Sequence, residues 1–572
     1  MKVSFRYTVM SAMSKKCKLR DYFDYWEVTD LESAIKENRD LETSSASINI
    51  SGYDKKKTIT FLELIKECGA SQKTIFAVNL WLNNLSNPND AVITSLQNFQ
   101  KLCDNVVSKS SLRWIWNLNP DGCLVPYYVK EIKYRSGNRE EAACVCISCE
   151  AQNMSTDRWS SDNKLTIQTE TKYIYFHRSN IGDLTENELL ESYFDNDDND
   201  DDEEIKTKKK PIKKEGFTLS KILSDKGVFL TSDEIYNDYK RQILDFQSVI
   251  KKIGKVYCSD SVAYTVNDGN NGYSSWKNIN IDDKISKLVV DDIKSIVFDS
   301  SKPLHPYVLT YNLNNYCYCI VHVDKITEYQ YDDKIVDKLI LSHGKKKLLK
   351  AIISNQNNFS DVVAGKSGGI VILASGKAGL GKTLTAEAYS ELMKKPLYCI
   401  QSSQLGVEVV EIEKRLSKIL YRAEKWNAVL LIDEADTYVQ QRGENIVQNC
   451  IVGIFLRLLE YFNGVLFLTT NRHEIIDDAI MSRVTAHIKY EYPDKEESTL
   501  LWKVLCNNFG IEISDIQIDK IFQHYETFSG RDIRNFLKMF TKTSDAKTIT
   551  LDCIKELEDF LPFIKTRNFL PI

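Results

Sequence analysis

The sequence lacks any long hydrophobic run and any dense cysteine framework. No apolar stretch approaches the roughly 20 residues of a membrane-spanning helix, so we expect a soluble protein with no membrane span. The first apolar stretch, VSFRYTVM, is interrupted by Arg6, which argues against a secretory signal. The 14 cysteines are scattered over 572 residues, so we expect reduced thiols and a cytoplasmic location.

The sequence also lacks a strong net charge. A formal charge of −5 gives no global field that would draw the chain to nucleic acid or to an anionic membrane. The first 20 residues hold six basic side chains and no acid, which leaves a transit peptide as the alternative to a solvated basic start. The apolar content of 43% is enough for several cores, and the length predicts roughly three to five domains.

One break in composition is sharp. Residues 195–204 read DNDDNDDDEE, with eight acids in ten positions, and residues 206–214 read KTKKKPIKK, with six lysines in nine. Blocks of like charge repel and bury no apolar area, so residues 195–215 are predicted to form a charged, disordered insertion. The acidic block lacks the glycine and the spaced glutamate of a calcium loop, so calcium binding is the weaker alternative.

Helix and strand patterns divide the rest of the chain. Helical patterns cover 61–106 and 217–256, and strand patterns cover 112–180 and 290–330. From about residue 331, short apolar strands alternate with longer helices, which indicates an α/β fold. We therefore expect five parts: an N-terminal α+β recognition region (1–194), the charged insertion (195–215), a second N-terminal α+β region (216–330), a large α/β domain (331–493), and a small helical lid domain with a C-terminal tail (494–572).

Two groups of side chains in the N-terminal half have a structural and a functional interpretation. The first, Cys144, Cys146 and Cys149, could be zinc ligands, but Cys144 and Cys146 fall on one face of a strand, as buried cysteines do. The second could be a binding platform, but an aromatic strand pair more often belongs to a core: Trp114, Trp116, Tyr127 and Tyr128. The core interpretation is favoured for both groups.

The most informative motif is GKAGLGKT at 376–383, which fits the phosphate-binding pattern G-x-x-x-x-G-K-[ST]. A short apolar strand precedes it and a helix-forming stretch follows it, so its backbone N–H groups can turn onto phosphate oxygens at a helix N-terminus. Lys382 is expected to reach the β- and γ-phosphates, and Thr383 to offer its hydroxyl to Mg²⁺. The expected nucleotide-binding residues are Gly376, Lys377, Ala378, Gly379, Leu380, Gly381, Lys382, Thr383, Leu384 and Asp433.

A second motif, VLLIDEAD at 429–436, supplies the acids that hydrolysis needs. Four apolar residues predict a buried parallel strand, whose carboxyl end is where α/β sheets place ligands. Asp433 would hold Mg²⁺ through the water shell of the ion, and Glu434 would polarise the attacking water. The alternative for this acidic pair is a solvated surface position.

Two further candidates follow. Asn471 ends the apolar stretch VLFLTTN and is expected to orient the water beside the γ-phosphate. Arg483 lies at the end of DDAIMSR, where it could reach the γ-phosphate of a neighbouring subunit and stabilise the transferring charge. The alternative for Arg483 is an ordinary surface arginine. The predicted catalytic set is therefore Glu434, Asn471 and Arg483.

This set of motifs, in this order, resembles the AAA+ ATPases over about residues 334–545. Residues 411–472 are similar to a group of largely uncharacterised bacterial and fungal AAA ATPases that carry long N-terminal regions. The resemblance implies a P-loop NTPase core, a parallel sheet flanked by helices, and a small helical lid. It also implies ATP and Mg²⁺ as cofactors, and a homo-oligomeric ring, usually a hexamer, with nucleotide sites between subunits. The segment around Leu339–Leu341 would pass beside the adenine.

The sequence departs from the family pattern in three places. No aromatic residue lies between Tyr398 and Tyr421, where threading AAA ATPases carry a pore residue, so only Leu405 or Val407 could grip a polypeptide weakly. Only one arginine, Arg483, lies where it could reach the γ-phosphate of a neighbouring subunit, whereas many relatives have two such arginines. FSGRDIRNF at 528–536 has an aspartate where some AAA+ proteins place a phosphate-sensing arginine; the candidates left open are Arg531 and Arg534.

The sequence thus predicts an ATP-hydrolysing ring that remodels a macromolecular partner recruited by the N-terminal region. A protein partner is expected rather than nucleic acid, because the lysine cluster at 206–214 is partly neutralised by the acidic run beside it. Two alternatives remain: an assembly switch or scaffold with slow turnover, and a nucleic-acid-handling ATPase.

Overall fold

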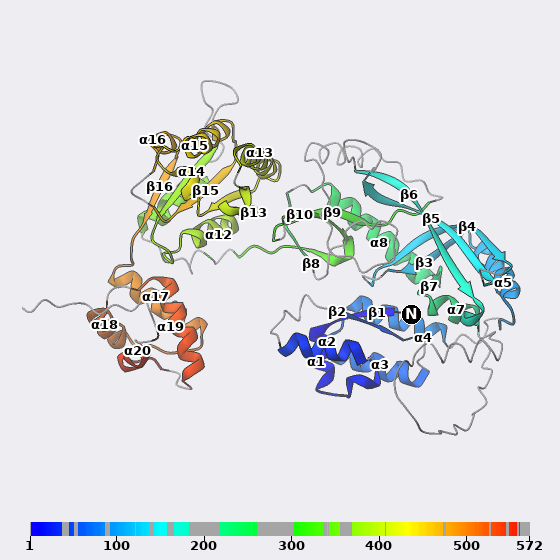
Figure 1. The fold of residues 1–572 in the computed structure, drawn as a ribbon. Coiled ribbons are helices and arrows are strands. Elements are labelled where there is room, and N and C mark those ends of the chain that lie inside the picture. The colour runs from blue at the N-terminus through cyan, green and yellow to red at the C-terminus, as the bar shows by residue number, and fades with distance from the viewer. Residues whose placement is uncertain are drawn as a thin grey trace, which may run out of the picture. The chain divides into compact units, whose positions relative to one another are not determined.

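The computed structural model divides the chain into two compact units (Figure 1). Unit 1 is Met1–Lys251 with Ser259–Thr327, and unit 2 is Lys252–Cys258 with Glu328–Ile572. The structure describes residues 2–23, 25–36, 45–50, 55–85, 92–119, 122–137, 142–156, 165–181, 218–252, 254–259, 302–314, 316–332, 335, 340, 343–354, 369–406, 408–472, 476–525, 528–544, 548–557 and 560. The insertion predicted at 195–215 lies outside the described residues, as do Leu339, Leu341 and Val407.

Unit 1 combines helices with antiparallel sheets. Its described elements are β1 (Lys2–Arg6), α1 (Tyr7–Ser14), η1 (Leu19–Asp21), α2 (Tyr25–Lys36), β2 (Ser45–Asn49), α3 (Lys55–Glu67), α4 (Gln72–Asn84), α5 (Leu96–Lys109), β3 (Trp114–Leu118), β4 (Leu124–Arg135), β5 (Cys144–Thr156), β6 (Leu165–His177), η2 (Arg178–Ile181), α7 (Leu219–Asp225), β7 (Val228–Leu230), α8 (Asp233–Ile250), β9 (Tyr307–Asn312), β10 (Cys317–His322) and η3 (Val323–Lys325). The strands β8 (Tyr257–Ser259) and β11 (Ile326–Glu328) span the boundaries between the units.

The main sheet of unit 1 is antiparallel and has the strand order β6-β5-β4-β3-β7. Because β7 pairs with β3, segments on both sides of residues 195–215 belong to one sheet. Of the aromatic side chains predicted for a core, Trp114, Trp116 and Tyr127 are buried in this sheet and Tyr128 is half-buried. Trp116 also has its polar group satisfied, since its Nε1–H donates to Thr231 Oγ1 at 3.1 Å.

Two buried histidines make the stability of unit 1 depend on pH. His305 donates from Nε2 to the Pro126 carbonyl at 2.9 Å, and His322 accepts at Nδ1 from the Asp324 N–H at 3.3 Å. Burial lowers the pKa of His305 to about 4 and the pKa of His322 to about 3. Both values lie below the ordinary value of 6.5, so below pH 6.5 the unfolded chain binds more protons than the folded one.

We therefore expect unit 1 to lose about 3 kcal/mol of unfolding free energy between pH 6.5 and pH 5 through these two histidines. Urea unfolding at a series of pH values, followed by tryptophan fluorescence, measures the loss. In a double variant with His305→Asn and His322→Asn, the unfolding free energy should fall by about 3 kcal/mol less over this pH range than in the wild type. This difference should be seen whatever the stability of the variant at pH 7.5. An unchanged slope in the double variant would contradict the prediction.

Unit 2 begins with an α/β arrangement and ends with four helices. Its described elements are α11 (His343–Ser354), β12 (Ile370–Gly376), α12 (Lys382–Met393), β13 (Leu397–Gln401), η4 (Ser402–Leu405), α13 (Val409–Lys425), β14 (Val429–Asp433), α14 (Asp436–Val439), α15 (Ile446–Leu459), β15 (Val465–Thr470), α16 (Asp478–Met481), β16 (Ala486–Tyr490), α17 (Lys495–Asn508), α18 (Asp515–His524), α19 (Gly530–Thr543) and α20 (Leu551–Leu557).

The sheet of unit 2 is parallel throughout, with the strand order β13-β14-β15-β12-β16. Its strands are apolar because they are buried: all six residues of β15 are buried, and so are the first four of β14. Helices flank the sheet (Figure 1). A parallel sheet flanked by helices, followed by a small helical part, confirms the fold class predicted for this region, and the mixed α+β content of unit 1 agrees with the prediction for the N-terminal half.

The chain enters unit 2 along the far end of α12. The Glu391 carboxylate accepts a hydrogen bond from the Tyr329 hydroxyl at 2.7 Å and another from the Asp332 N–H at 2.8 Å. The bond to Glu391, together with burial, raises the pKa of Tyr329 to about 12. The helix that follows the predicted phosphate loop thus ends at a fixed contact with the entering segment. Among the described residues, no helix has the length and hydrophobicity needed to cross a membrane.

Candidate active site

The predicted phosphate loop connects β12 to α12 at the carboxyl end of the parallel sheet. Gly376, the last residue of β12, has φ +148°, and a Cβ atom there would lie 2.3 Å from the Tyr490 carbonyl oxygen on β16. Gly379, at the middle of the loop, has φ +80°, and its Cβ would lie 2.8 Å from both Ser529 Oγ and Arg531 Cβ. The two glycines are therefore required by close backbone packing as well as by the left-handed conformation.

Lys382 is buried at the centre of the site, with 8% of its surface exposed. Its ammonium group donates to the Gly376 carbonyl at 2.8 Å, to the Lys377 carbonyl at 2.7 Å and to Asn471 Oδ1 at 2.9 Å. Burial lowers the pKa of Lys382, and nearby Asp433 opposes that shift. A phosphate oxygen carries charge, so it is a stronger acceptor than these neutral oxygens and can compete for the three donors. The residues present fit a nucleotide phosphate.

The two expected Mg²⁺ ligands lie together. The Thr383 hydroxyl donates to Asp433 Oδ1 at 3.1 Å, and the Thr469 hydroxyl donates to the same oxygen. Hydroxyl and carboxylate oxygens are the hard ligands that Mg²⁺ prefers, and Mg²⁺ is bound by one or two protein groups together with substrate phosphates. Thr383 and Asp433 therefore fit the ion predicted from the sequence.

Glu434 follows Asp433 in a backbone conformation unusual for a residue with a side chain. Its φ is +54°, and its N–H donates to Thr469 Oγ1 at 3.0 Å. Its side chain is exposed, and among the described residues its carboxylate has no hydrogen-bond partner. The carboxylate is thus available to a water molecule at the end of the sheet, and its role in polarising that water stays a prediction.

Asn471 joins this group from the end of β15. Besides its bond with Lys382, its backbone N–H donates to Asp436 Oδ1 at 3.0 Å, and the Thr470 hydroxyl donates to the same oxygen. The structure therefore brings together Lys382, Thr383, Asp433, Glu434 and Asn471. Sequence reasoning gave no role to Asp436, Thr469 or Thr470, although all three lie inside the motifs VLLIDEAD and VLFLTTN.

Arg483 is not part of that group within one chain. It is exposed after α16, and its Nη1 donates to the Ala479 carbonyl at 3.1 Å. Among the described residues it has no acidic partner, whereas Arg442 is paired with the buried Asp477 at 2.8 Å. An exposed guanidinium without a carboxylate remains able to act on a ligand outside its own chain.

The segment at 528–536 brings an arginine to the loop. Asp532 completes a capping box with Ser529, because each side chain accepts the backbone N–H of the other residue. Asp532 therefore caps α19. Arg531 lies beside Gly379, and its charge contributes to lowering the pKa of Lys382. Of the two candidates left open by the sequence, the structure places Arg531 at the phosphate loop.

The residues after β13 bear on substrate gripping. Leu405 is fully buried, so it belongs to the core and is not available to grip a polypeptide. Exposed apolar side chains occur instead at the starts of the next helices: Val410 on α13 is 79% exposed and Ile446 on α15 is 76% exposed. Sequence reasoning missed these two positions because it looked for an aromatic residue.

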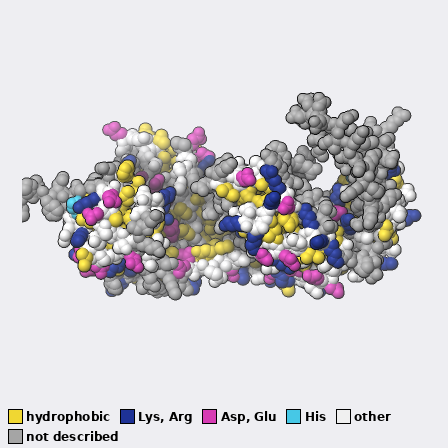
Figure 2. Space-filling view, turned by 90° about the horizontal axis from the view of Figure 1, so that it is seen from below, with side chains coloured by type: hydrophobic (Ala, Val, Ile, Leu, Met, Phe, Trp, Pro, Cys, Tyr) yellow, Lys and Arg dark blue, Asp and Glu magenta, His cyan; other side chains and the backbone are white. Residues whose placement is uncertain are grey.

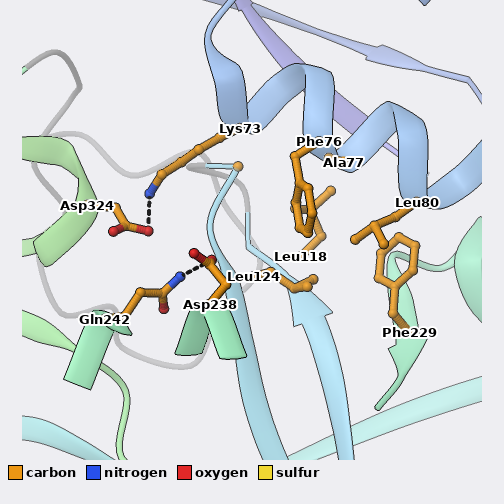
Figure 3. Close-up of a pocket in the computed structure, with 11 residues that line it drawn as sticks. Lys73, Phe76, Ala77, Leu80, Leu118, Leu124, Phe229, Asp238, Gln242 and Asp324 are labelled. Atoms are coloured by element: carbon orange, nitrogen blue, oxygen red, sulfur yellow. Dashed lines mark hydrogen bonds and ion pairs between the residues drawn. The ribbon is translucent and has the colours of Figure 1, made fainter. Parts of the chain in front are cut away.

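A separate pocket lies in unit 1 (Figure 3). Its open space is about 360 Å³, part of which is continuous with solvent, and its polar and apolar residues occupy different sides. At the polar side, Lys73 is paired with Asp324 at 2.8 Å, and Gln242 donates to Asp238 at 2.7 Å. Arg241 contacts the Asp238 carboxylate at 2.7 Å and the Asp324 carboxylate at 3.0 Å. The charges that line this pocket neutralise one another, and we assign it no nucleotide.

Comparison with known proteins shows which family residues 372–492 resemble. The family model described as AAA, the ATPase family associated with various cellular activities, matches residues 372–492. A putative 26S proteasome regulatory subunit homolog of Methanothermobacter thermautotrophicus is 28% identical over 173 residues, which is 29% of this chain and 46% of that protein. The ATP-dependent zinc metalloprotease FTSH 2, chloroplastic, of Arabidopsis thaliana is 26% identical over 201 residues, which is 33% of this chain and 29% of that protein.

The chain therefore spans less than half the length of these curated relatives. Among solved structures, the FIGL-1 AAA domain in complex with ADP is 20% identical and covers 41% of this chain and 92% of that one, with a TM-score of 0.32, which is too low to carry an argument. The matched range, residues 372–492, includes the phosphate loop, both acids, Asn471 and Arg483 of this chain. Residues 372–492 are therefore similar to the AAA family, which supports an AAA+ ATPase core in this part of the chain.

Proposed function

We propose that the chain hydrolyses ATP with Mg²⁺ and works as a ring of identical subunits, a hexamer by family resemblance, that remodels a protein partner. The observation that supports hydrolysis is the convergence of Lys382, Thr383, Asp433, Glu434 and Asn471 at one end of the parallel sheet. Nucleotide binding alone needs the loop and Lys382. Hydrolysis needs in addition the Glu434 carboxylate, which is exposed and has no partner among the residues that the structure describes.

Each residue has a distinct role in this proposal. The loop N–H groups and Lys382 bind the phosphates of ATP, while Thr383 and Asp433 hold Mg²⁺, which neutralises phosphate charge when bound. Glu434 accepts a hydrogen bond from the attacking water and takes up its proton. Asn471 orients that water, and Arg531 contributes positive charge from α19.

The direct test is phosphate release by the full-length chain with ATP and Mg²⁺. We expect turnover that stops when EDTA removes the metal. The matched control is the same preparation with ADP, which should release no phosphate. If the chain binds ATP but releases no phosphate, with Mg²⁺ or with EDTA, the result would contradict hydrolysis. It would favour the alternative proposal of an assembly switch, which the burial of Leu405 also favours.

The ring is tested through Arg483. We expect Arg483→Ala to lower turnover tenfold or more while ATP affinity stays within twofold, because an exposed guanidinium with no acidic partner among the described residues is free to act on a neighbouring subunit's site. The measurement is ATP turnover per chain at increasing protein concentration, compared between the Arg483→Ala variant and the wild type. Lys489→Ala, which removes an exposed cation from β16, is the control and should match the wild type. A wild-type rate for Arg483→Ala at high protein concentration would contradict the role.

A protein partner is favoured over nucleic acid by the surface. Exposed apolar side chains at Val410, Ile446 and Val447 suit contact with a polypeptide. Figure 2 shows acidic and basic side chains interspersed over the described residues of the face that it draws, rather than a uniform basic stripe. The recruiting surface is proposed to be in unit 1.

A further inference from the structure

Thr469 connects the two carboxylates of the site. It lies on β15, is 2% exposed, and donates from Oγ1 to Asp433 Oδ1. Thr469 Oγ1 also accepts the Glu434 N–H at 3.0 Å, and the Thr469 carbonyl accepts the Ala435 N–H at 2.8 Å. Three consecutive residues of the acidic motif are thus bonded to one threonine on the neighbouring strand.

The backbone at Glu434 explains why these bonds matter. A residue with a side chain at φ +54° is strained by roughly 1–2 kcal/mol, and such a conformation persists when surrounding contacts fix it. The two bonds from residues 434 and 435 to Thr469 are contacts of that kind. Because φ and ψ set the direction of Cβ, holding this turn also sets where the Glu434 carboxylate points.

We propose that Thr469 is a positioning residue for ATP hydrolysis: its hydroxyl orients the Asp433 carboxylate and holds the turn that directs Glu434. The inference rests on the proposed ATPase function. Thr469 acts through its neighbours and does not itself touch the nucleotide. Valine has nearly the same shape but leaves the Glu434 N–H and one Asp433 oxygen without this partner, whereas serine retains both bonds.

The test compares Thr469→Val with Thr469→Ser in the full-length chain. We expect Thr469→Val to lower kcat about 10–100-fold and to raise the Mg²⁺ concentration for half-maximal binding of an ATP analogue about tenfold. Affinity for the analogue in EDTA should stay within twofold, because the loop and Lys382 are untouched. Thr469→Ser should stay within threefold of the wild type in all three measurements.

Ser390→Ala is the matched control. The Ser390 hydroxyl is equally buried but donates to the Glu387 carbonyl at 2.8 Å within its own helix, so its removal should change neither kcat nor the Mg²⁺ response. If Thr469→Val does not fold, Thr469→Ala replaces it, since alanine removes the hydroxyl without adding bulk.

Two results would overturn the role of Thr469. One is a hydroxyl-free variant with kcat and Mg²⁺ response within twofold of the wild type. The other is a serine variant as slow as the valine variant, which would show that the methyl group, not the hydroxyl, matters. If the wild type binds ATP but releases no phosphate, the proposed ATPase function fails, and the Mg²⁺ response of analogue binding still decides whether Thr469 positions Asp433.

Discussion

Glu434→Gln is expected to bind ATP and hydrolyse it about 100–10,000-fold more slowly than the wild type. Glutamine keeps the size of the side chain and the backbone bond to Thr469, but it cannot take the proton of the attacking water. The loop and Lys382 are unchanged, so ATP affinity should stay within threefold. Bound ATP then persists, and the mass of the assembly with ATP and Mg²⁺ can be measured by light scattering after gel filtration.

The mass should increase to a closed ring of about six subunits when ATP and Mg²⁺ are present, with ADP as the reference state. The matched control is Glu496→Gln, the same substitution at an exposed glutamate in the first turn of α17, which should hydrolyse ATP at the wild-type rate. A Glu434→Gln protein that binds ATP and remains a monomer would contradict the ring. A Glu434→Gln protein with wild-type turnover would remove Glu434 from the mechanism.

Lys382→Met is expected to weaken ATP binding at least hundredfold, or by about 3 kcal/mol. The substitution removes a buried ammonium group together with its three donors to Gly376, Lys377 and Asn471. Methionine fills similar space, so the melting temperature should change little while affinity is lost. Equilibrium titration with a fluorescent ATP analogue measures the effect with and without Mg²⁺.

The control for Lys382→Met is Lys414→Met, which replaces an exposed lysine of α13 and should leave affinity unchanged. The interpretation depends on the comparison in EDTA, where Mg²⁺ cannot compensate for the lost charge. Affinity within threefold of the wild type in that condition would show that the loop does not hold phosphate in the way described.

Much of unit 2 could be predicted from the sequence because its information is local. A parallel strand buried on both faces is a run of apolar residues, so β14 and β15 are visible as VLLID and VLFLTT. Carboxyl ends of parallel strands meet at one edge of the sheet, so Asp433 and Asn471 could be expected near the phosphate loop. The left-handed turns at glycines likewise follow from the loop pattern.

The rest depends on contacts between distant segments. Nothing local indicates that the Thr469 hydroxyl would bond to both Asp433 and the Glu434 N–H, since each bond depends on the register of two strands. The approach of Arg531 to Gly379 depends on how the small helical part packs against the loop. In unit 1, helices and strands could be recognised one by one, but the pairing of β7 with β3 across the charged insertion could not.

The contact at the end of α12 has a mechanical consequence. The 12 residues from Lys382 to Met393 form a rod about 18 Å long, at about 1.5 Å per residue, with the phosphate loop at one end. Near the other end, Glu391 holds Tyr329 and Asp332, where the polypeptide enters the unit. A stiff rod transmits at one end a displacement imposed at the other. A displacement of the loop end of α12 along the helix axis would therefore also displace Glu391 and, through its two hydrogen bonds, the segment from Tyr329 to Asp332.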